Sequence, residues 1–146
     1  MTQISRSAIV PHSADQMFQL VADIESYPKF LPWCGGARVL STDGNEVKAS
    51  VNIAYKGVNK SFTTLNTQQA DSSIEMRLVE GPFKKLHGQW MFDRLDDTAS
   101  KVSLKLEFEF ANPLVAMTLG KVFASIADTL VDSFCKRAHE IYGTRE

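Results

Sequence analysis

The chain has 146 residues, of which 44% are hydrophobic and 23% charged, a balance that excludes a disordered or collagen-like protein. Sixteen Lys and Arg residues against 17 Asp and Glu residues leave a net charge of −1, which excludes an overall field that would draw the chain onto DNA, RNA or an anionic membrane. Any such partner would have to be met by a local patch. The length predicts a single domain over residues 1–146.

The first part of the chain predicts a strand, a short helix and a proline-rich connection. Residues 2–10 are rich in β-formers and end at Pro11, which indicates a strand. Ser13, followed three residues later by Gln16, forms a capping box for a short amphipathic helix. Pro28 and Pro32 then limit the segment 23–36 to one or two helical turns.

Between residues 37 and 111 the hydrophobic period changes to two and predicts six strands. Asp43-Gly44 is a hairpin signal between the first two, and further strands fit 59–69, 73–80, 84–95 and 101–110. In the last of these, apolar residues from Val102 to Phe110 alternate with polar ones without exception. Together with the first strand, this predicts a curved antiparallel sheet of about seven strands with one solvated face.

Asn112 as N-cap and Pro113 at the first helical position start a long helix that extends to Tyr142, roughly 45 Å. Its apolar stripe is Val115, Leu119, Val122, Phe123, Ile126, Leu130, Phe134, Ala138 and Ile141. Lys121 and Asp128 interrupt the most apolar stretch, which argues against a membrane span. The expected fold is therefore α+β, with this helix in the concave face of the sheet.

The two cysteines and the start of the chain predict a cytoplasmic protein. Cys34 and Cys135 form neither a Cys-x-x-Cys pair nor a dense framework, so we expect two reduced thiols. The N-terminus lacks the basic stretch and apolar run of a secretory signal. Cys135 and His139 are spaced as neighbours on the last helix, but two ligands rarely make a site, and we expect no metal.

The pattern does not favour an enzyme. No phosphate-binding or nucleophile motif occurs, and the carboxylates of the clearest strands face water. The polar residues in the inward phase are Arg6, Tyr55, Thr64, Asn66 and, near a strand end, Glu80. We interpret them chiefly as structural hydrogen-bond partners, with contacts to a ligand head group as the alternative, because no two make an acid–base pair.

An aromatic, proline-stiffened segment at 27–33 stands where polar turn residues would be expected. It is either a lid packed on the core or an apolar flap at the mouth of a cavity between sheet and helix. Gly81-Pro82-Phe83 with Trp90, and the wholly apolar first helical turn at 114–117, give two further hints. We expect all three segments to border one opening.

At these segments the chain resembles START-like helix-grip proteins of the coenzyme Q-binding and polyketide cyclase/lipid transport family, over nearly its full length. The resemblance is carried by residues 4–6 (Ile-Ser-Arg), 27–32 (Tyr-Pro-Lys-Phe-Leu-Pro) with Cys34, 79–86 (Val-Glu-Gly-Pro-Phe-Lys-Lys-Leu) with Gly88 and Trp90, and 108–110 (Phe-Glu-Phe) with Asn112. It implies a helix-grip fold around a tunnel for a long apolar molecule.

We therefore expect a non-enzymatic protein that needs no cofactor and carries a lipid or a polyprenyl quinone such as ubiquinone, in support of respiration, with transient contact to the inner membrane. Burial of an isoprenoid tail would drive affinity. The expected tunnel and flap residues are Tyr27, Pro28, Phe30, Leu31, Pro32, Trp33, Phe83, Trp90, Phe108, Phe110, Phe123, Ile126 and Leu130.

The resemblance leaves two alternatives. In a bacterial branch it implies the toxin of a toxin–antitoxin pair, which binds the 50S ribosomal subunit and blocks formation of 70S particles. Such a contact would use Lys84, Lys85, Lys136 and Arg137, although basic pairs of this kind are more often solvated surface. A polyketide cyclase would instead need Glu80 or Tyr55 as an inward acid or base, and no DNA partner is expected under any of the three hypotheses.

Overall fold

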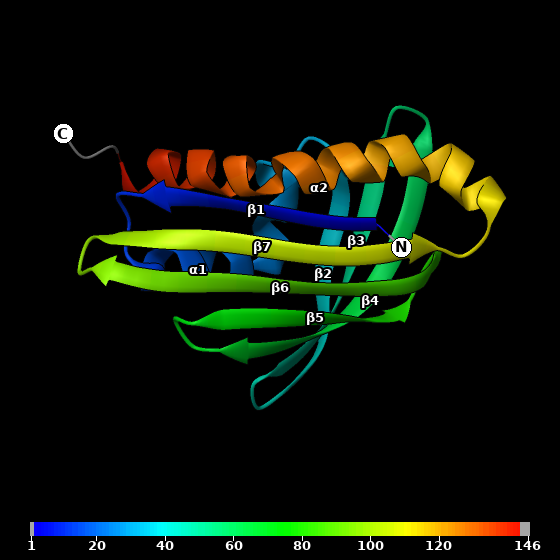
Figure 1. Cartoon of the computed structure of the whole chain (residues 1–146). Coiled ribbons are helices and arrows are strands. Elements are labelled where there is room, and N and C mark those ends of the chain that lie inside the picture. The colour runs from blue at the N-terminus through cyan, green and yellow to red at the C-terminus, as the bar shows by residue number, and fades with distance from the viewer. Residues whose placement is uncertain (1, 144–146) are drawn as a thin grey trace.

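A computed structural model describes residues 2–143, which form one seven-stranded antiparallel sheet and a long helix that crosses it (Figure 1). The strands are β1 (Thr2–Val10), β2 (Cys34–Asp43), β3 (Glu46–Tyr55), β4 (Val58–Gln69), β5 (Ser73–Glu80), β6 (Phe83–Asp96) and β7 (Ala99–Phe110). Their order in the sheet is β1-β7-β6-β5-β4-β3-β2, so every strand after the first pairs with its sequence neighbour, and β1 joins the last strand. The predicted fold class and the predicted strands are confirmed, with most strand ends shifted by only one or two residues. The exception is β2, which begins at Cys34, three residues earlier than predicted.

The sheet is strongly curved. Figure 1 shows β2, β3 and β4 running steeply across the direction of β1, β7 and β6. Register shifts interrupt the ladders between β2 and β3, β4 and β5, and β6 and β7, and such irregularities increase local twist. The β1–β7 ladder, by contrast, is continuous from Thr2–Phe108 to Val10–Ser100. The curvature creates the concave face that receives the helix.

The chain enters this concave face through α1 (Ala14–Ala22) and the 3-10 helix η1 (Ile24–Lys29). The Ser13 side chain accepts a hydrogen bond from the Gln16 N–H at 3.1 Å, and the Gln16 side chain accepts one from the Ser13 N–H at 3.0 Å. The predicted capping box is therefore confirmed. Pro28 lies inside η1, which stops at the following residue, so the proline-limited helical turns are confirmed as well.

The long helix α2 (Pro113–Tyr142) begins where predicted, because Asn112 Oδ1 accepts a hydrogen bond from the Val115 N–H at 2.9 Å. Its buried side consists of Leu119, Phe123, Ile126, Ala127, Val131, Phe134 and Ala138. Ile141, predicted on the stripe, is exposed. Within residues 2–143, α2 is the one helix with the length and composition of a membrane span, a property that core helices share.

The C-terminal end of α2 is tied to the start of the chain. Nε2 of the buried His12 lies 3.0 Å from Nδ1 of His139, and the Tyr142 hydroxyl donates a hydrogen bond to the Gln16 carbonyl at 3.2 Å. The Ser100 hydroxyl donates to the His12 carbonyl at 2.9 Å. These contacts join β1, β7, α1 and α2 at one end of the molecule.

Candidate functional site

The half of the groove nearer the start of α2 is filled by aromatic rings. Phe123 of α2 lies 4.8 Å from Phe108 and 4.9 Å from Phe83, measured between ring centres, and Phe110 and Phe62 complete the group at 6.1 and 6.4 Å. Most of these contacts are edge-to-face, an arrangement that aromatic rings prefer in cores. The structure thus brings four predicted tunnel residues, Phe83, Phe108, Phe110 and Phe123, into contact, and adds Phe62, which was not among them.

A second aromatic group surrounds Phe134 near the other end of α2. Tyr27, Phe30 and Trp90 have ring centres 5.4, 5.3 and 5.3 Å from that of Phe134. The Tyr27 hydroxyl donates a hydrogen bond to the Val21 carbonyl at 2.5 Å, and burial raises the pKa of this phenol well above its usual range. Segment 27–33 therefore packs as a lid on the core, which was one of its two predicted roles.

The remaining predicted lining residues divide by exposure. Leu31, Trp33 and Ile126 are buried, and Leu130 is half-buried. Pro28 and Pro32 are exposed on the outside of the lid. These two prolines stiffen the connection but do not line the groove between sheet and helix.

The expectation that three segments border one opening is wrong. The lid contacts Phe134, whereas the apolar first turn of α2 lies at residues 114–117. Twenty helical residues separate Leu114 from Phe134, which is about 30 Å along the helix axis. The lid and the first turn are thus at opposite ends of the groove, because α2 runs its full length.

The end of the groove at the start of α2 is the more open one. A depression of about 370 Å³ reaches Phe108 and Phe110, and is bordered by Lys84 and Ala116. A second hollow of about 470 Å³ lies between the β3–β4 hairpin (residues 56–60) and Thr118 and Leu119. Leu114 and Met117, 67% and 77% exposed, stand beside these hollows and leave apolar surface unpartnered.

Three of the five polar residues predicted to point inward do not do so. Arg6 is half-exposed and forms an ion pair with Asp128, joining edge strand β1 to α2. Tyr55 ends β3 at a hairpin and is exposed, as is Glu80 at the end of β5. At strand ends the alternation no longer decides which face meets the core, so the inward placements of Tyr55 and Glu80 are corrected. Arg6 lies mid-strand, but β1 is an edge strand, and its side chain reaches the exposed flank of α2 and not the core.

The other two polar residues are inside the sheet. Thr64 and Asn66 are buried, and the Thr64 hydroxyl donates a hydrogen bond to Asn66 Oδ1 at 2.8 Å. They therefore satisfy each other, as the structural interpretation predicts. The exposed positions of Glu80 and Tyr55 also remove the inward acid and base that a cyclase would need.

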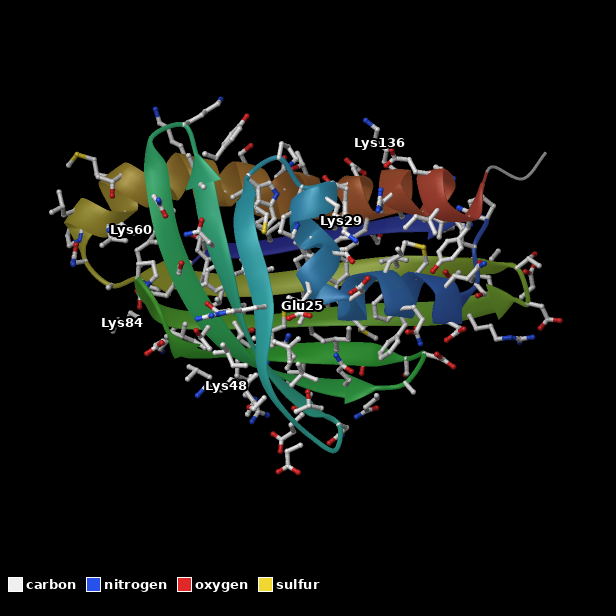
Figure 2. All side chains as sticks on the ribbon, turned by 180° about the vertical axis from the view of Figure 1, so that it is seen from behind. Glu25, Lys29, Lys48, Lys60, Lys84 and Lys136 are labelled. Atoms are coloured by element: carbon white, nitrogen blue, oxygen red, sulfur yellow. The ribbon has the colours of Figure 1, made fainter. Side chains whose placement is uncertain are left out.

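The four predicted ribosome-contacting cations form two separate clusters. Lys84 and Lys85 begin β6, and Lys84 lies 3.9 Å from Glu109. Lys136 and Arg137 lie near the end of α2 and share a pocket of about 330 Å³ with Lys29 of η1. Figure 2 shows Lys84 at the end of the molecule opposite Lys136.

The thiols and possible metal ligands suggest no reactive centre. Burial raises the pKa of Cys135 to about 11, and the negative charge of Asp132 adds to this effect. Burial also raises the pKa of Cys34. Both are free cysteines with little thiolate at neutral pH. Across residues 2–143, no three His, Cys, Asp or Glu side chains are grouped as a metal site would require.

Sequence reasoning missed two aromatic residues of these clusters. Phe62 has the same strand parity as Thr64 and Asn66, both assigned inward, so the alternation of β4 pointed to it. Phe134 was placed on the helical stripe but not among the site residues. Its role at the centre of the second cluster depends on the lid, whose docking place no periodicity indicates.

A curved antiparallel sheet closed around a long C-terminal helix defines the START-like helix-grip class of proteins. The chain belongs to the family described as polyketide cyclase / dehydrase and lipid transport, whose model matches residues 10–135. The START superfamily protein from Mycobacterium smegmatis has the same fold, with a TM-score of 0.80, 19% identity and coverage of 95% of this chain and 98% of that one. The family resemblance is therefore confirmed.

Named relatives narrow the comparison. The chain is 46% identical over 145 residues to the ribosome association toxin RatA of Escherichia coli (strain K12), covering 99% of this chain and 92% of the relative. It is 26% identical to the mitochondrial coenzyme Q-binding protein COQ10 of Dictyostelium discoideum, covering 91% of this chain and 67% of that protein. These names describe association and binding, not catalysis, in agreement with the expectation of a protein that is not an enzyme.

An aromatase/cyclase is similar to this chain in fold alone. The Zhui aromatase/cyclase from Streptomyces sp. R1128 superposes with a TM-score of 0.81 over 99% of both chains, but at 14% identity. Sequence identity at this level does not indicate a shared activity. The likeness therefore supports the helix-grip architecture and leaves function to the site itself.

Proposed function

We propose that this protein is a non-enzymatic, cytoplasmic ribosome-associating protein that binds the 50S subunit and hinders its joining to the 30S subunit, as a toxin would. One observation carries the proposal, which is the 46% identity to the ribosome association toxin RatA over 99% of this chain. The match includes the lid, the aromatic groove and both basic clusters, since it leaves only a residue or so of this chain unmatched.

A protein of net charge −1 must meet ribosomal RNA through local cations. The two basic clusters, Lys84 with Lys85 and Lys136 with Arg137, offer such patches at opposite ends of the molecule. Because they are so far apart, one flat contact would use one cluster at a time. The proposal therefore predicts that a single cluster dominates binding.

Sedimentation of ribosomes with added protein tests the proposal. The wild-type protein should reduce 70S particles in favour of free 50S and 30S subunits, and less so at high salt, because salt screens exposed charges. Either Lys136→Gln or the double variant Lys84→Gln/Lys85→Gln should weaken the loss of 70S particles much more than the other does. Lys121→Gln, with the same charge change elsewhere on α2, is the matched control. An unchanged profile with wild-type protein would contradict the proposal.

We also propose a second candidate, the binding of an apolar molecule such as a polyprenyl quinone. It is supported by the exposed apolar turn at Leu114 and Met117 beside the hollow that reaches Phe108 and Phe110. Similarity to a coenzyme Q-binding protein is consistent with it. A long tail would have to displace aromatic rings that contact one another, so ligand entry requires the groove to open at the start of α2, where a membrane surface could be touched transiently.

Solvent extraction of the purified protein, followed by mass spectrometry and quinone absorbance, tests this second candidate. A stoichiometric quinone would support it. Ala116→Trp, which fills the mouth of the hollow, should then reduce the bound lipid. Ser125→Trp on the exposed side of α2 is the matched control. An empty wild-type protein that also fails to take up added quinone would contradict this candidate and leave the ribosomal proposal untouched.

A further inference from the structure

A pocket of about 330 Å³ separates the end of η1 from the last turns of α2. Lys29, Phe30 and Pro32 form one wall, and Lys136, Arg137 and Glu140 form the other. Figure 2 shows Lys29 and Lys136 on the same side of the molecule. The volume lies within the range of small-ligand pockets, and the pocket is distinct from the aromatic groove and its open end.

The charges of this pocket are unbalanced. Three cations and one carboxylate leave a formal charge of +2. Among residues 2–143, the carboxylates in ion pairs are held by other basic side chains, and none lies within pairing distance of Lys29, Lys136 or Arg137. Nε of Arg137 is buried without a hydrogen-bond partner. The excess of positive charge in the pocket lining favours an anionic ligand.

The guanidinium group of Arg137 is held in place by an aromatic ring. Its central carbon lies 5.1 Å from the centre of the Phe30 ring, a cation–π contact. Phe30 itself rests against Phe134 at 5.3 Å and against Tyr27 at 6.2 Å. The cation is thus positioned before any ligand arrives, which lowers the entropy lost on binding.

We infer that this pocket binds one nucleotide unit, with its phosphate at Lys29, Lys136 and Arg137 and its base against Pro32 and the Arg137 guanidinium. Arg offers a fork of donors that matches phosphate oxygens, and Lys supplies a mobile point charge. Nucleobases stack on guanidinium groups and on apolar rings. Inorganic phosphate or a small carboxylate such as acetate would satisfy the cations but would leave the apolar wall uncovered.

The same chemistry is presented by a free nucleotide and by a strand of RNA. The choice of RNA as the source rests on the proposed ribosome association. The binding of a nucleotide in this pocket does not depend on that proposal. Its lining residues are contributed by the lid and by α2, which pack on each other through Phe134. The site therefore exists in the isolated protein and can be tested there.

Isothermal titration calorimetry with the full chain tests the inference, using adenosine monophosphate, adenosine, inorganic phosphate and a short single-stranded oligoadenylate. Adenosine monophosphate should bind once per chain, and adenosine or phosphate alone at least about tenfold more weakly. Arg137→Gln and Lys136→Gln should each weaken binding about tenfold, the loss of one charge-assisted hydrogen bond. Glu140→Gln should tighten binding, and Lys121→Gln should leave it unchanged.

The result that overturns the inference is equally specific. It fails if adenosine monophosphate does not bind, if both cation variants bind it as the wild type does, or if phosphate alone binds as tightly as the nucleotide. Should Arg137→Gln fail to fold, Lys136→Gln and Lys29→Gln decide, because both lysines are exposed. Competition by the oligoadenylate identifies RNA as the source, and its absence identifies a free nucleotide.

The two proposals can fail separately. A protein that binds adenosine monophosphate but leaves the ribosome profile unchanged contradicts ribosome association and keeps the pocket. If the wild type and Lys136→Gln shift the ribosome profile equally, and the wild type binds no nucleotide, the pocket proposal is wrong and ribosome association stands.

Discussion

The two ends of α2 are built from the same amphipathic stripe but are covered differently. At the start of the helix, Phe123 packs among sheet phenylalanines while Leu114 and Met117 are exposed beside two hollows. At its end, the lid covers Phe134, and His139 is joined to His12. The two ends differ in how they are covered: both pack on the sheet, but the second end is also covered by the lid.

The two ligand proposals place separate tasks at the two ends. The open end has the apolar exposure and the hollows that an apolar ligand would need, and the closed end has the grouped cations that an anionic ligand would need. The closed end is packed under the lid and tied to the start of the chain through His12 and His139. A helix about 45 Å long can therefore serve two kinds of recognition without either disturbing the other.

The largest expected effect compares the two aromatic clusters. Phe123→Ala should lower the free energy of unfolding by about 3–5 kcal/mol, because Phe123 is 4% exposed and its removal leaves a cavity among four rings. Phe30→Ala should cost about half as much, since Phe30 is half-buried. Urea denaturation measures both. Equal losses would mean that the lid is as much a part of the core as the sheet.

The next effect concerns how the open end of α2 is held. Asn112→Ala removes the bond from the Val115 N–H to the Asn112 side chain and should lower stability by about 1 kcal/mol. Amide exchange of the first helical turn should rise with it, while the turn around His139 keeps its protection. Urea denaturation and hydrogen exchange give the two readings. Increased exchange at both ends would show that α2 unfolds as one unit.

A smaller effect appears at high pH, at the closed end. The folded protein raises the pKa of Cys135 to about 11 by burial and by Asp132, from an ordinary thiol value near 9. The unfolded chain then loses this proton first, so stability should fall as the pH rises from about 9 towards about 11. Cys135→Ala should fall less steeply over this range in urea denaturation. Cys34, whose pKa is raised in the same direction, contributes to the remaining slope.

The smallest effect on stability is expected at the exposed turn. Leu114→Ser combined with Met117→Ser should change the free energy of unfolding by less than about 0.5 kcal/mol, because both side chains are largely in water. Binding of the protein to quinone-containing vesicles, if the open end admits an apolar ligand, should weaken in the same variant. A marked loss of stability would instead show that this turn packs in the folded protein.

Much of the fold could be predicted because it depends on local patterns. Alternation over 101–110 indicated a strand with one wet face, and Ser13 with Gln16, and Asn112 with Pro113, marked where the helices begin. Predictions failed at strand ends, where Tyr55 and Glu80 were placed inward. At these positions the alternation of apolar and polar residues continues, but no second layer of the fold covers the side chain.

By itself, the sequence determined which residues are apolar on each element, where each helix begins, and the family to which the chain belongs, because these follow from period, capping and local motifs. Only the tertiary structure decided that the lid meets Phe134 and that Lys29 joins Lys136 and Arg137 in one pocket. Residues more than a hundred positions apart in the chain meet there because the curved sheet leads α2 back beneath the lid. No short-range pattern encodes where a covering segment docks on a continuous apolar stripe.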